Sequence, residues 1–381
     1  MKAIKSTRVL TPQGEISGYI CYDEDQILSV TAMAPQKAEI YDAGDLIVCP
    51  GFIDVHNHGA SDYDFSDADA EGIGIAIDFH LQHGTTTIVP TVTSVSCERT
   101  EASLEEMTRF LEKGTHKANV VGVHLEGPYF SPAQCGAQSA EYLTPPDEKQ
   151  YMHLLRKFPG LIKRWSYAPE LDKDQKFARA LAENGVQGSI GHSDALQSDC
   201  VAAYENGTRC VTHLYSCTST ITRDKGFRRL GIIETAYLMD EIYVEMIADG
   251  CHLPPDLIRM IYKIKGSDRI CMVTDAMRAT GVEGGQSFIG GRPCIIEDGV
   301  AKLPDRSAFA GSIATTDRLL RTCVLKAGIP LAEGVKMLTE TPAKLLGIHA
   351  GVIEAGARPD FVILNEELAV QRVIVGGEFV K

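Results

Sequence analysis

The stretch Pro50-Gly51-Phe52-Ile53-Asp54-Val55-His56-Asn57-His58 decides the fold of this 381-residue chain. It is a short apolar run that ends in two histidines at i and i+2, whose imidazoles point the same way on an extended segment and can bind one metal ion. Seven similar strand-like runs follow, at residues 86–90, 120–125, 162–167, 186–190, 208–214, 243–247 and 270–274. Helical patterns separate many of the runs, at residues 70–82, 99–113, 175–183 and 255–264. Eight alternating βα units predict an α/β protein built on a closed (β/α)8 TIM-type barrel.

Both ends of the chain read as short β-strands broken by turn residues. The N-terminal runs indicate a small antiparallel sheet, and the C-terminal runs include a hairpin turn at Gly376-Gly377. These runs lie at residues 14–22, 26–30, 360–364, 371–375 and 378–380. We expect the two ends to pair into one small domain of residues 1–49 and 350–381, beside a catalytic barrel of residues 50–349.

The region after the eighth run is less clearly patterned. Residues 284–303 read as short strands with Gly and Pro breaks, and their pattern does not place them in the barrel. Residues 315–327 and 331–338 read as closing helices, the second reaching Pro342 and either ending or restarting there. We interpret Gly311-Ser312 as a turn rather than as part of a pocket wall.

The overall composition argues against several classes of protein. A formal net charge of −14 disfavours binding to nucleic-acid phosphates, because such binding needs clustered Lys and Arg. No apolar run reaches the length of about 18 residues that a membrane span needs, and Met1 to Leu10 carry no signal-peptide run. The eleven cysteines form no C-x-x-C pair, which suits a reducing compartment better than a disulfide framework. We therefore expect a cytoplasmic protein without nucleic-acid or membrane partners.

Polar residues recur at the ends of the strand runs, which is where barrel enzymes place their chemistry. Glu126 follows the third run, His192 the fifth and Asp275 the eighth, while His213 lies within the sixth. Glu126 alone could form an ordinary ion pair, and a single histidine is more often structural than a ligand. Four histidines with a carboxylate form a pattern of N and O ligands that favours a Zn, Fe, Mn or Co site over a structural Cys-rich zinc site, and it leaves the choice among these four ions open. A carboxylate such as Asp275 can accept a proton from a water whose pKa the metal has lowered toward about 7.

Longer motifs carry a resemblance to a known family. The stretch Pro50 to His58 resembles the amidohydrolase superfamily, and five later motifs occur in the order found in N-acetylglucosamine-6-phosphate deacetylases. These motifs are His124-Leu125-Glu126-Gly127-Pro128-Tyr129, Gly191-His192-Ser193, Thr212-His213-Leu214-Tyr215, Ala248-Asp249-Gly250-Cys251-His252 and Val273-Thr274-Asp275-Ala276-Met277. The resemblance covers nearly the whole chain and implies that the terminal segments form a small β-sandwich.

The resemblance also implies roles for the residues at the strand ends. Glu126, His192 and His213 would hold the catalytic divalent metal. His56 and His58 would bind a second ion bridged by Glu126, which gives one or two ions per subunit. Asp275 would deprotonate the attacking water and later protonate the leaving amine.

The expected substrate contacts include departures from the family. His252 matches a histidine that contacts the substrate phosphate or sugar, with a hydrogen bond to backbone as the alternative reading. Ser216-Cys217 stands where the family usually has Asn-Ala, which removes an asparagine that helps to hold the phosphate. Gln138 stands where the family usually has a histidine that polarises the acyl carbonyl. Glutamine can still donate a hydrogen bond there, but not as a cation.

The resemblance also implies an arginine supplied by a neighbouring subunit, and therefore a homodimer. Arg223 is the closest positional match in the basic segment 222–229, with Arg228 and Arg229 as substitutes. Arginine suits bidentate phosphate recognition. A solvated charged loop is the alternative reading of this segment.

We therefore predict a metal-dependent hydrolase that deacetylates an N-acetyl amino sugar phosphate, in first place N-acetylglucosamine-6-phosphate. A second hypothesis keeps the metal site and changes the substrate to N-acetylgalactosamine-6-phosphate, an unphosphorylated N-acetyl sugar or an N-acyl amino acid. A third hypothesis is a non-catalytic binding or assembly protein on the same barrel. Such a protein would be expected to have lost metal ligands.

Overall fold

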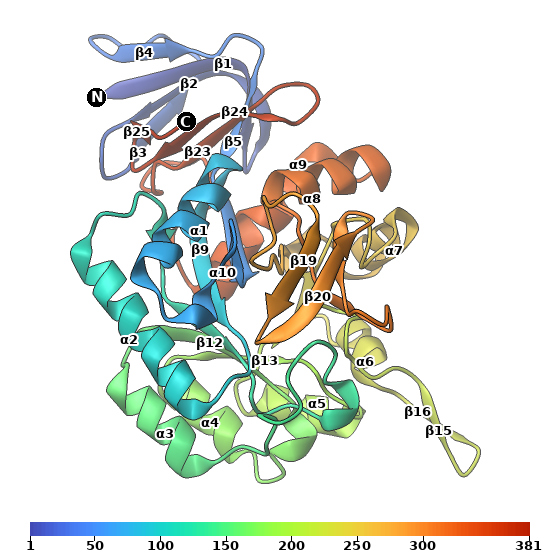
Figure 1. Cartoon of the computed structure of the whole chain (residues 1–381). Helices are drawn as coiled ribbons and strands as arrows, with labels where there is room; N and C mark the ends of the chain where they lie inside the picture. Colours follow the sequence, from blue (N-terminus) through green and yellow to red (C-terminus); the bar gives the residue numbers. More distant parts are fainter.

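A computed structural model describes residues 1–381 and confirms the predicted barrel. Each of the eight predicted runs contributes a parallel strand, and the strands follow one another around the barrel in chain order (Figure 1). They are β6 (Phe52–Asn57), β9 (Thr85–Val92), β11 (Val123–Glu126), β12 (Ile162–Tyr167), β13 (Gln187–Ile190), β14 (Cys210–Val211), β17 (Tyr243–Met246) and β18 (Ile270–Met272).

The third predicted run is interrupted by a glycine. A short strand, β10 (Asn119–Val120), pairs with β9 before β11 begins. Gly122 lies between them with φ +143°, and a Cβ there would lie 2.5 Å from the carbonyl oxygen of Leu161. Only glycine tolerates both this close contact and this φ angle. Because φ +143° is not a strand dihedral, the predicted run is divided at Gly122 into β10 and β11.

The seam of the barrel lies between its first and last strands. β6 and β18 share no strand pairing, and single hydrogen bonds instead join β6 to the residues that follow β18. The N–H of Asp275 donates to the carbonyl oxygen of His56 at 2.9 Å. Deeper in the barrel wall, the buried carboxylate of Asp54 accepts hydrogen bonds from the hydroxyl and the N–H of Thr274. The seam therefore fixes the histidine end of β6 against the segment that carries Asp275.

Helices surround the barrel strands (Figure 1). Several begin at a side chain that caps the first turn, such as Asp69 before α1, Ser96 before α2 and Asp147 before α3. The helices are α1 (Ala70–Gln82), α2 (Cys97–Lys113), α3 (Glu148–Lys157), α4 (Lys176–Glu183), α5 (Gln197–Glu205), α6 (Ile232–Leu238), α7 (Pro255–Lys265), α8 (Thr316–Arg321), α9 (Leu331–Leu338) and α10 (Glu340–Leu346).

The closing helices differ in detail from the prediction. The predicted helix at 315–327 is α8, which continues as a π-helical turn over Thr322–Lys326. α9 ends at Leu338 and does not reach Pro342. That proline lies in the first turn of α10, where its missing N–H removes no intrahelical hydrogen bond.

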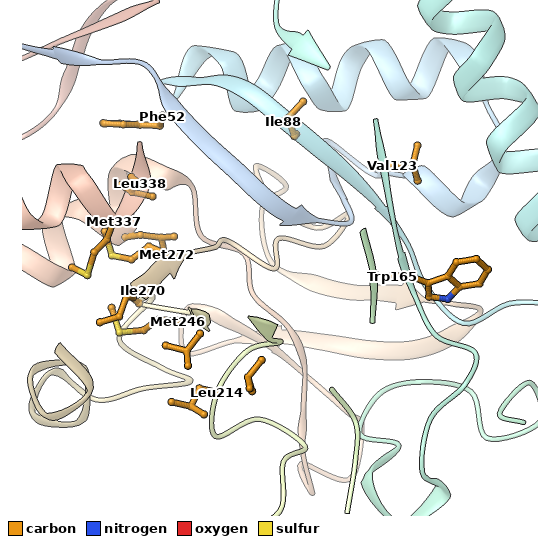
Figure 2. Close-up of a cluster of buried hydrophobic side chains, with 14 of the residues drawn as sticks. Phe52, Ile88, Val123, Trp165, Leu214, Met246, Ile270, Met272, Met337 and Leu338 are labelled. Carbon is orange, nitrogen blue, oxygen red and sulfur yellow. The ribbon is translucent and has the colours of Figure 1, made fainter. Parts of the chain in front are cut away.

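The largest apolar core, of 63 buried residues, fills the space between barrel strands and helices. Figure 2 shows part of it, where strand residues such as Phe52 and Met272 lie near Met337 and Leu338 of α9. A smaller cluster that includes Ile53, Val55 and Val273 covers the other face of the same strands. At these positions the barrel strands carry apolar side chains on both faces, as parallel strands usually do. Fully burying one such side chain contributes roughly 1.5–3 kcal/mol.

The two chain ends form one mixed eight-stranded sheet, with both termini in it (Figure 1). Its strands are β1 (Lys2–Thr11), β2 (Gly14–Tyr22), β3 (Ile27–Thr31), β4 (Glu39–Asp42), β5 (Ile47–Pro50), β23 (Phe361–Leu364), β24 (Val370–Val375) and β25 (Glu378–Phe379). Among the N-terminal strands, the predicted antiparallel order holds for β1, β2 and β3, and the predicted C-terminal hairpin is the antiparallel pair β24 and β25. β1 runs parallel to β4 and to β5, because the chain crosses over before each of them.

Residues of this sheet alternate between two cores. Val48, Ile363 and Ile374 pack into a cluster of 12 residues within the terminal module. Their neighbours Ile47 and Val373 instead belong to the large core of the barrel. The strand period of two thus attaches the module to the barrel through one apolar face.

Two further β elements lie near the C-terminal ends of the barrel strands. Residues 284–303 form β19 (Gly285–Ile289), β20 (Arg292–Glu297) and β21 (Val300–Lys302), and β22 (Phe309–Gly311) completes an antiparallel sheet. The hairpin of β15 (Thr222–Asp224) and β16 (Phe227–Arg229) projects away from the barrel (Figure 1). None of the helices has the length and apolar character needed to cross a bilayer.

Candidate metal centre and substrate pocket

The structure brings together all five predicted metal ligands and Asp275 at the C-terminal ends of the strands. His56 and His58 come from β6 and the residue after it, Glu126 ends β11, and the other three residues follow β13, β14 and β18. His192, His213 and Asp275 have left-handed φ angles of +46°, +26° and +46°. Each such non-glycine residue costs about 1–3 kcal/mol, and such strain is typical of functional sites that surrounding contacts hold in place.

The ligand atoms form two groups that share Glu126. In the first group, His58 Nε2 lies 3.3 Å from His56 Nε2 and 3.3 Å from Glu126 Oε2. In the second group, Glu126 Oε1 lies 3.3 Å from His192 Nε2 and 3.0 Å from His213 Nε2. Asp275 Oδ1 approaches the first group at 3.3 Å from His58 Nε2.

In three of the four histidines, the ring nitrogen that faces away from the ligand groups, Nδ1, has a hydrogen-bond partner. His192 Nδ1 lies 2.9 Å from the carbonyl oxygen of Gln134, and His213 Nδ1 lies 3.0 Å from that of Ser216. His56 Nδ1 lies 2.9 Å from a carboxylate oxygen of Glu245. An acceptor at Nδ1 places the proton there and leaves the Nε2 lone pair free for a metal ion. Four converging Nε2 atoms with a shared carboxylate therefore fit a binuclear divalent site.

The charges of these groups stabilise one another. Burial alone would lower the pKa of His56, but the carboxylates of Glu245, Glu126 and Asp275 raise it well above its usual value. Burial likewise opposes the charge of His58, yet Asp275 and Glu126 raise its pKa to about 9. Burial would raise the pKa of Glu126, but His56 and hydrogen bonds from His192 and His213 hold it well below its usual range. Because carboxylates lie among these imidazole nitrogens, a divalent cation can bind there in place of the imidazole protons.

A cavity of about 200 Å³ opens above these ligands. Among the predicted substrate residues, Gln138, Ser216, Cys217 and His252 line it. Gly311 also lines it, so the interpretation of that residue as a turn alone was wrong. The remaining wall is mostly apolar and comes from Ala137, Ile289, Ala308, Phe309 and Ala310.

The Gln138 carboxamide has a defined orientation. Its Oε1 accepts hydrogen bonds from the hydroxyl of Thr93 at 2.8 Å and from the backbone N–H of Ser94 at 3.0 Å. Its Nε2 donates to Glu126 Oε2 at 2.6 Å. Because a backbone N–H can only donate, the amide nitrogen must face the ligands and the cavity. One N–H of Gln138 is therefore left for a substrate.

His252 is held by a carboxylate. Its Nδ1 lies 2.8 Å from Asp249 Oδ2, and its backbone N–H donates to the other oxygen of the same carboxylate at 2.8 Å. The ring of Phe309 packs on its edge with centroids 4.8 Å apart. This geometry differs from the alternative of a histidine bonded to backbone, and it leaves the second ring nitrogen of His252 available.

The predicted arginines do not line the cavity of this chain. Arg223 and Arg228 lie on the exposed hairpin β15–β16, where every residue of both strands is exposed. Neither Lys nor Arg lines the cavity itself. The hairpin therefore contributes no cation to the cavity of its own chain.

Sequence reasoning missed two groups of site residues. Glu245 and Arg164, fully buried inside the barrel, form an ion pair that supports His56. A charged residue within an otherwise buried strand run was the available signal for both. Ile289 and Phe309 come from the inserted sheet, whose place above the cavity no local pattern indicates.

Comparisons with known proteins agree with this geometry. Residues 47–380 match the Amidohydrolase family. A Lysinibacillus sphaericus protein named N-acetylglucosamine-6-phosphate deacetylase is 33% identical over 333 residues, which are 86% of this chain and 84% of the relative. An Escherichia coli O157:H7 protein named N-acetylgalactosamine-6-phosphate deacetylase is 26% identical over 98% of each chain.

A solved structure matches along the whole chain. It is an aspartate-to-alanine mutant of the N-acetyl-D-glucosamine-6-phosphate deacetylase from Mycobacterium smegmatis, in complex with N-acetyl-D-glucosamine-6-phosphate. It is 31% identical, with a TM-score of 0.92 over 100% of this chain and 99% of that chain. Since the sequence relatives and the fold agree over nearly every residue, the chain belongs to the amidohydrolase family and, within it, to the N-acetylglucosamine-6-phosphate deacetylases.

Proposed function

We propose that this protein hydrolyses N-acetylglucosamine-6-phosphate to glucosamine-6-phosphate and acetate. The observation that carries the proposal is the convergence of four imidazole nitrogens and Glu126 beside Asp275, at a cavity lined by all of these residues except the fully buried His56. A non-catalytic binding protein on this barrel would be expected to have lost metal ligands, and here every predicted ligand is present. Four imidazoles and carboxylates without thiolate support Zn²⁺ at one or two positions, with Fe, Mn or Co as substitutes.

The chain's own residues can carry the proton and orient the acyl group. Bound divalent ions would polarise the acyl oxygen and lower the pKa of the attacking water. Asp275 accepts a proton from that water as its oxygen bonds to the carbonyl carbon, and returns a proton to the nitrogen as the C–N bond breaks. The free N–H of Gln138 donates to the acyl oxygen as negative charge develops there. His252 contacts the sugar or its phosphate.

The phosphate contact is proposed to need a homodimer. In one chain the cavity contains no Lys or Arg, and the phosphate dianion would meet only His252, Ser216 and Cys217. Arg223 or Arg228 on the projecting hairpin of a second copy would supply the missing charge, because bidentate arginine contacts match phosphate oxygens. We also propose that residues 1–49 and 350–381 form a supporting domain for a catalytic barrel of residues 50–349. The eleven free cysteines support a cytoplasmic location.

A second candidate function, hydrolysis of a different N-acyl substrate at the same metal site, follows from the absence of Lys and Arg in the cavity lining. An N-acetyl sugar without phosphate would leave no charge unpaired in the cavity of a single chain. N-acetylgalactosamine-6-phosphate and N-acyl amino acids remain within this second candidate, because Ser216-Cys217 and Gln138 alter the substrate contacts.

Acetate release from a substrate panel tests the proposal. The panel contains both N-acetyl amino sugar 6-phosphates, the two unphosphorylated sugars and N-acetyl amino acids, with protein of measured metal content. A strong preference for N-acetylglucosamine-6-phosphate is the expected result. Preference for an unphosphorylated sugar would favour the second candidate, and no cleavage of any member by metal-loaded protein would refute the deacetylase function.

A further inference from the structure

A buried ion pair lies inside the barrel beneath the metal ligands. Arg164 and Glu245 are both fully buried. The guanidinium of Arg164 donates to Gln187 Oε1 at 2.9 Å, to the carbonyl oxygen of Val55 at 2.7 Å and to Glu245 Oε1. Every guanidinium nitrogen of Arg164 thus has a partner on another barrel strand: Gln187 on the adjacent β13, Val55 on β6 and Glu245 on β17. The ion pair holds Glu245 ionised, with its second oxygen free for other donors.

That second oxygen of Glu245 contacts both groups of metal ligands. Oε2 lies 2.9 Å from Nδ1 of His56 and accepts the backbone N–H of His213 at 3.1 Å. An ionised carboxylate can only accept hydrogen bonds, so His56 must carry its proton on Nδ1. The Nε2 lone pair of His56 is then directed toward His58 and Glu126.

The four histidine ligands are supported differently. His192 and His213 each have a neutral backbone carbonyl at Nδ1. Nδ1 of His58 is buried and has no partner. His56 is therefore the one ligand of its group with an oriented ring, and its support is a charged carboxylate. Such outer partners fix the tautomer of a ligand and raise its basicity.

We propose that Glu245, held by Arg164, is the positioning residue for the metal position formed by His56 and His58. Without an acceptor at this place, His56 can rotate or carry its proton on Nε2, and that position loses its metal. The position formed by Glu126, His192 and His213 keeps its own carbonyl supports. This inference rests on the metal site of the proposed function but not on its substrate. Metal content is measured without substrate, so failure of the deacetylase proposal would leave this test unaffected.

Two double variants separate the acceptor from the buried charge. Arg164→Met with Glu245→Gln removes the ion pair but keeps an oxygen that can accept from His56 and from the N–H of His213. Arg164→Met with Glu245→Leu removes the ion pair and the acceptor together. Neither variant leaves an unpaired buried charge, which is the usual reason that single changes in such a pair fail to fold. Circular dichroism and thermal unfolding establish that both are folded.

Zinc content after dialysis against a buffered zinc solution is the measurement. The glutamine double variant is expected to bind two equivalents per chain. The leucine double variant is expected to bind about one, with affinity at the lost position about 10- to 100-fold weaker. Equal zinc content in the two double variants, whether at two equivalents or at one, would overturn the proposal.

The unmutated protein provides a second readout if the leucine variant does not fold. In zinc-loaded protein with ¹⁵N-labelled histidine, His56 is expected to carry its proton on Nδ1 and to bind through Nε2, with assignment by a His56→Gln variant. A His56 ring bound through Nδ1, or protonated at Nε2, would overturn the proposal independently of any Glu245 variant.

Discussion

Replacing Asp275 by Asn tests the proton-transfer role most directly. Asparagine keeps the shape and the Oδ1 acceptor that faces His58 Nε2 at 3.3 Å, but it cannot take up a proton. One positioned acid or base contributes about 10²- to 10⁴-fold to the rate. Both proton transfers depend on this carboxylate, but only the slower one limits turnover. We therefore expect kcat to fall by about 10²- to 10⁴-fold, which corresponds to roughly 3–5 kcal/mol.

The assay combines acetate release with metal analysis of the same preparation. Metal content is expected to stay at the wild-type level, because none of the histidine ligands is changed. Asp360→Asn is a matched control, since Asp360 is a buried aspartate of the terminal module, remote from the cavity lining. Turnover within about tenfold of wild type at full metal content would refute the role of Asp275 as proton carrier. A parallel loss of metal would instead assign Asp275 as a ligand.

Four further outcomes are expected. Gln138→Leu should lower kcat by about 10²-fold by removing a donor to the acyl oxygen, whereas Gln138→His should retain most activity in steady-state kinetics. Arg223→Ala and Arg228→Ala should lower kcat/KM for a phosphorylated sugar by about tenfold or more relative to its unphosphorylated counterpart, since a hydrogen bond to a charged group contributes about 1.5–3 kcal/mol. Dialysis against a chelator should abolish acetate release and added Zn²⁺ should restore it, and activity that survives verified metal removal would contradict the metal-dependent mechanism. Burial lowers the pKa of His80 from 6.5 to about 4, so below pH 6.5 the unfolded chain takes up a proton that the folded chain does not, and stability falls. The free energy of unfolding, measured with urea, should therefore fall between pH 7 and pH 5 by roughly 2 kcal/mol less in His80→Gln than in wild type. Equal decreases in the two proteins would contradict this assignment.

Elements with strong local signals could be predicted from the sequence. α1 has the predicted bounds because Asp69 caps it and its apolar spacing is helical. The sixth strand was predicted too long, at residues 208–214, and only Cys210 and Val211 pair in the sheet. The chain leaves the ladder where His213 adopts a left-handed φ, and apolar spacing carries no information about that dihedral.

A site residue could be predicted from the sequence where its position along a strand alone decides where its side chain lies. His56, Glu126 and Asp275 lie at or just after the C-terminal ends of barrel strands, so parallel topology alone brings them to one rim. The support beneath them depends on which strands face one another across the barrel. Arg164 and Glu245 are about 80 residues apart and belong to different strands. Their contact therefore results from closure of the barrel, which no local sequence pattern indicates. The same holds for Phe309, whose sheet packs above the cavity through tertiary contacts.

The terminal sheet has a consequence for synthesis of the chain. β5 ends at Pro50 and pairs with β23, which begins at Phe361, roughly 310 residues later. At translation rates of about 5–20 residues per second, the edge of β5 waits about 15–60 s on the ribosome for its partner. During that interval the nascent N-terminal strands present unpaired backbone and two apolar faces, which is the state most prone to aggregation. The early strands therefore remain without their last partners until synthesis is nearly complete, and a circular permutant that joins the two ends would shorten this interval.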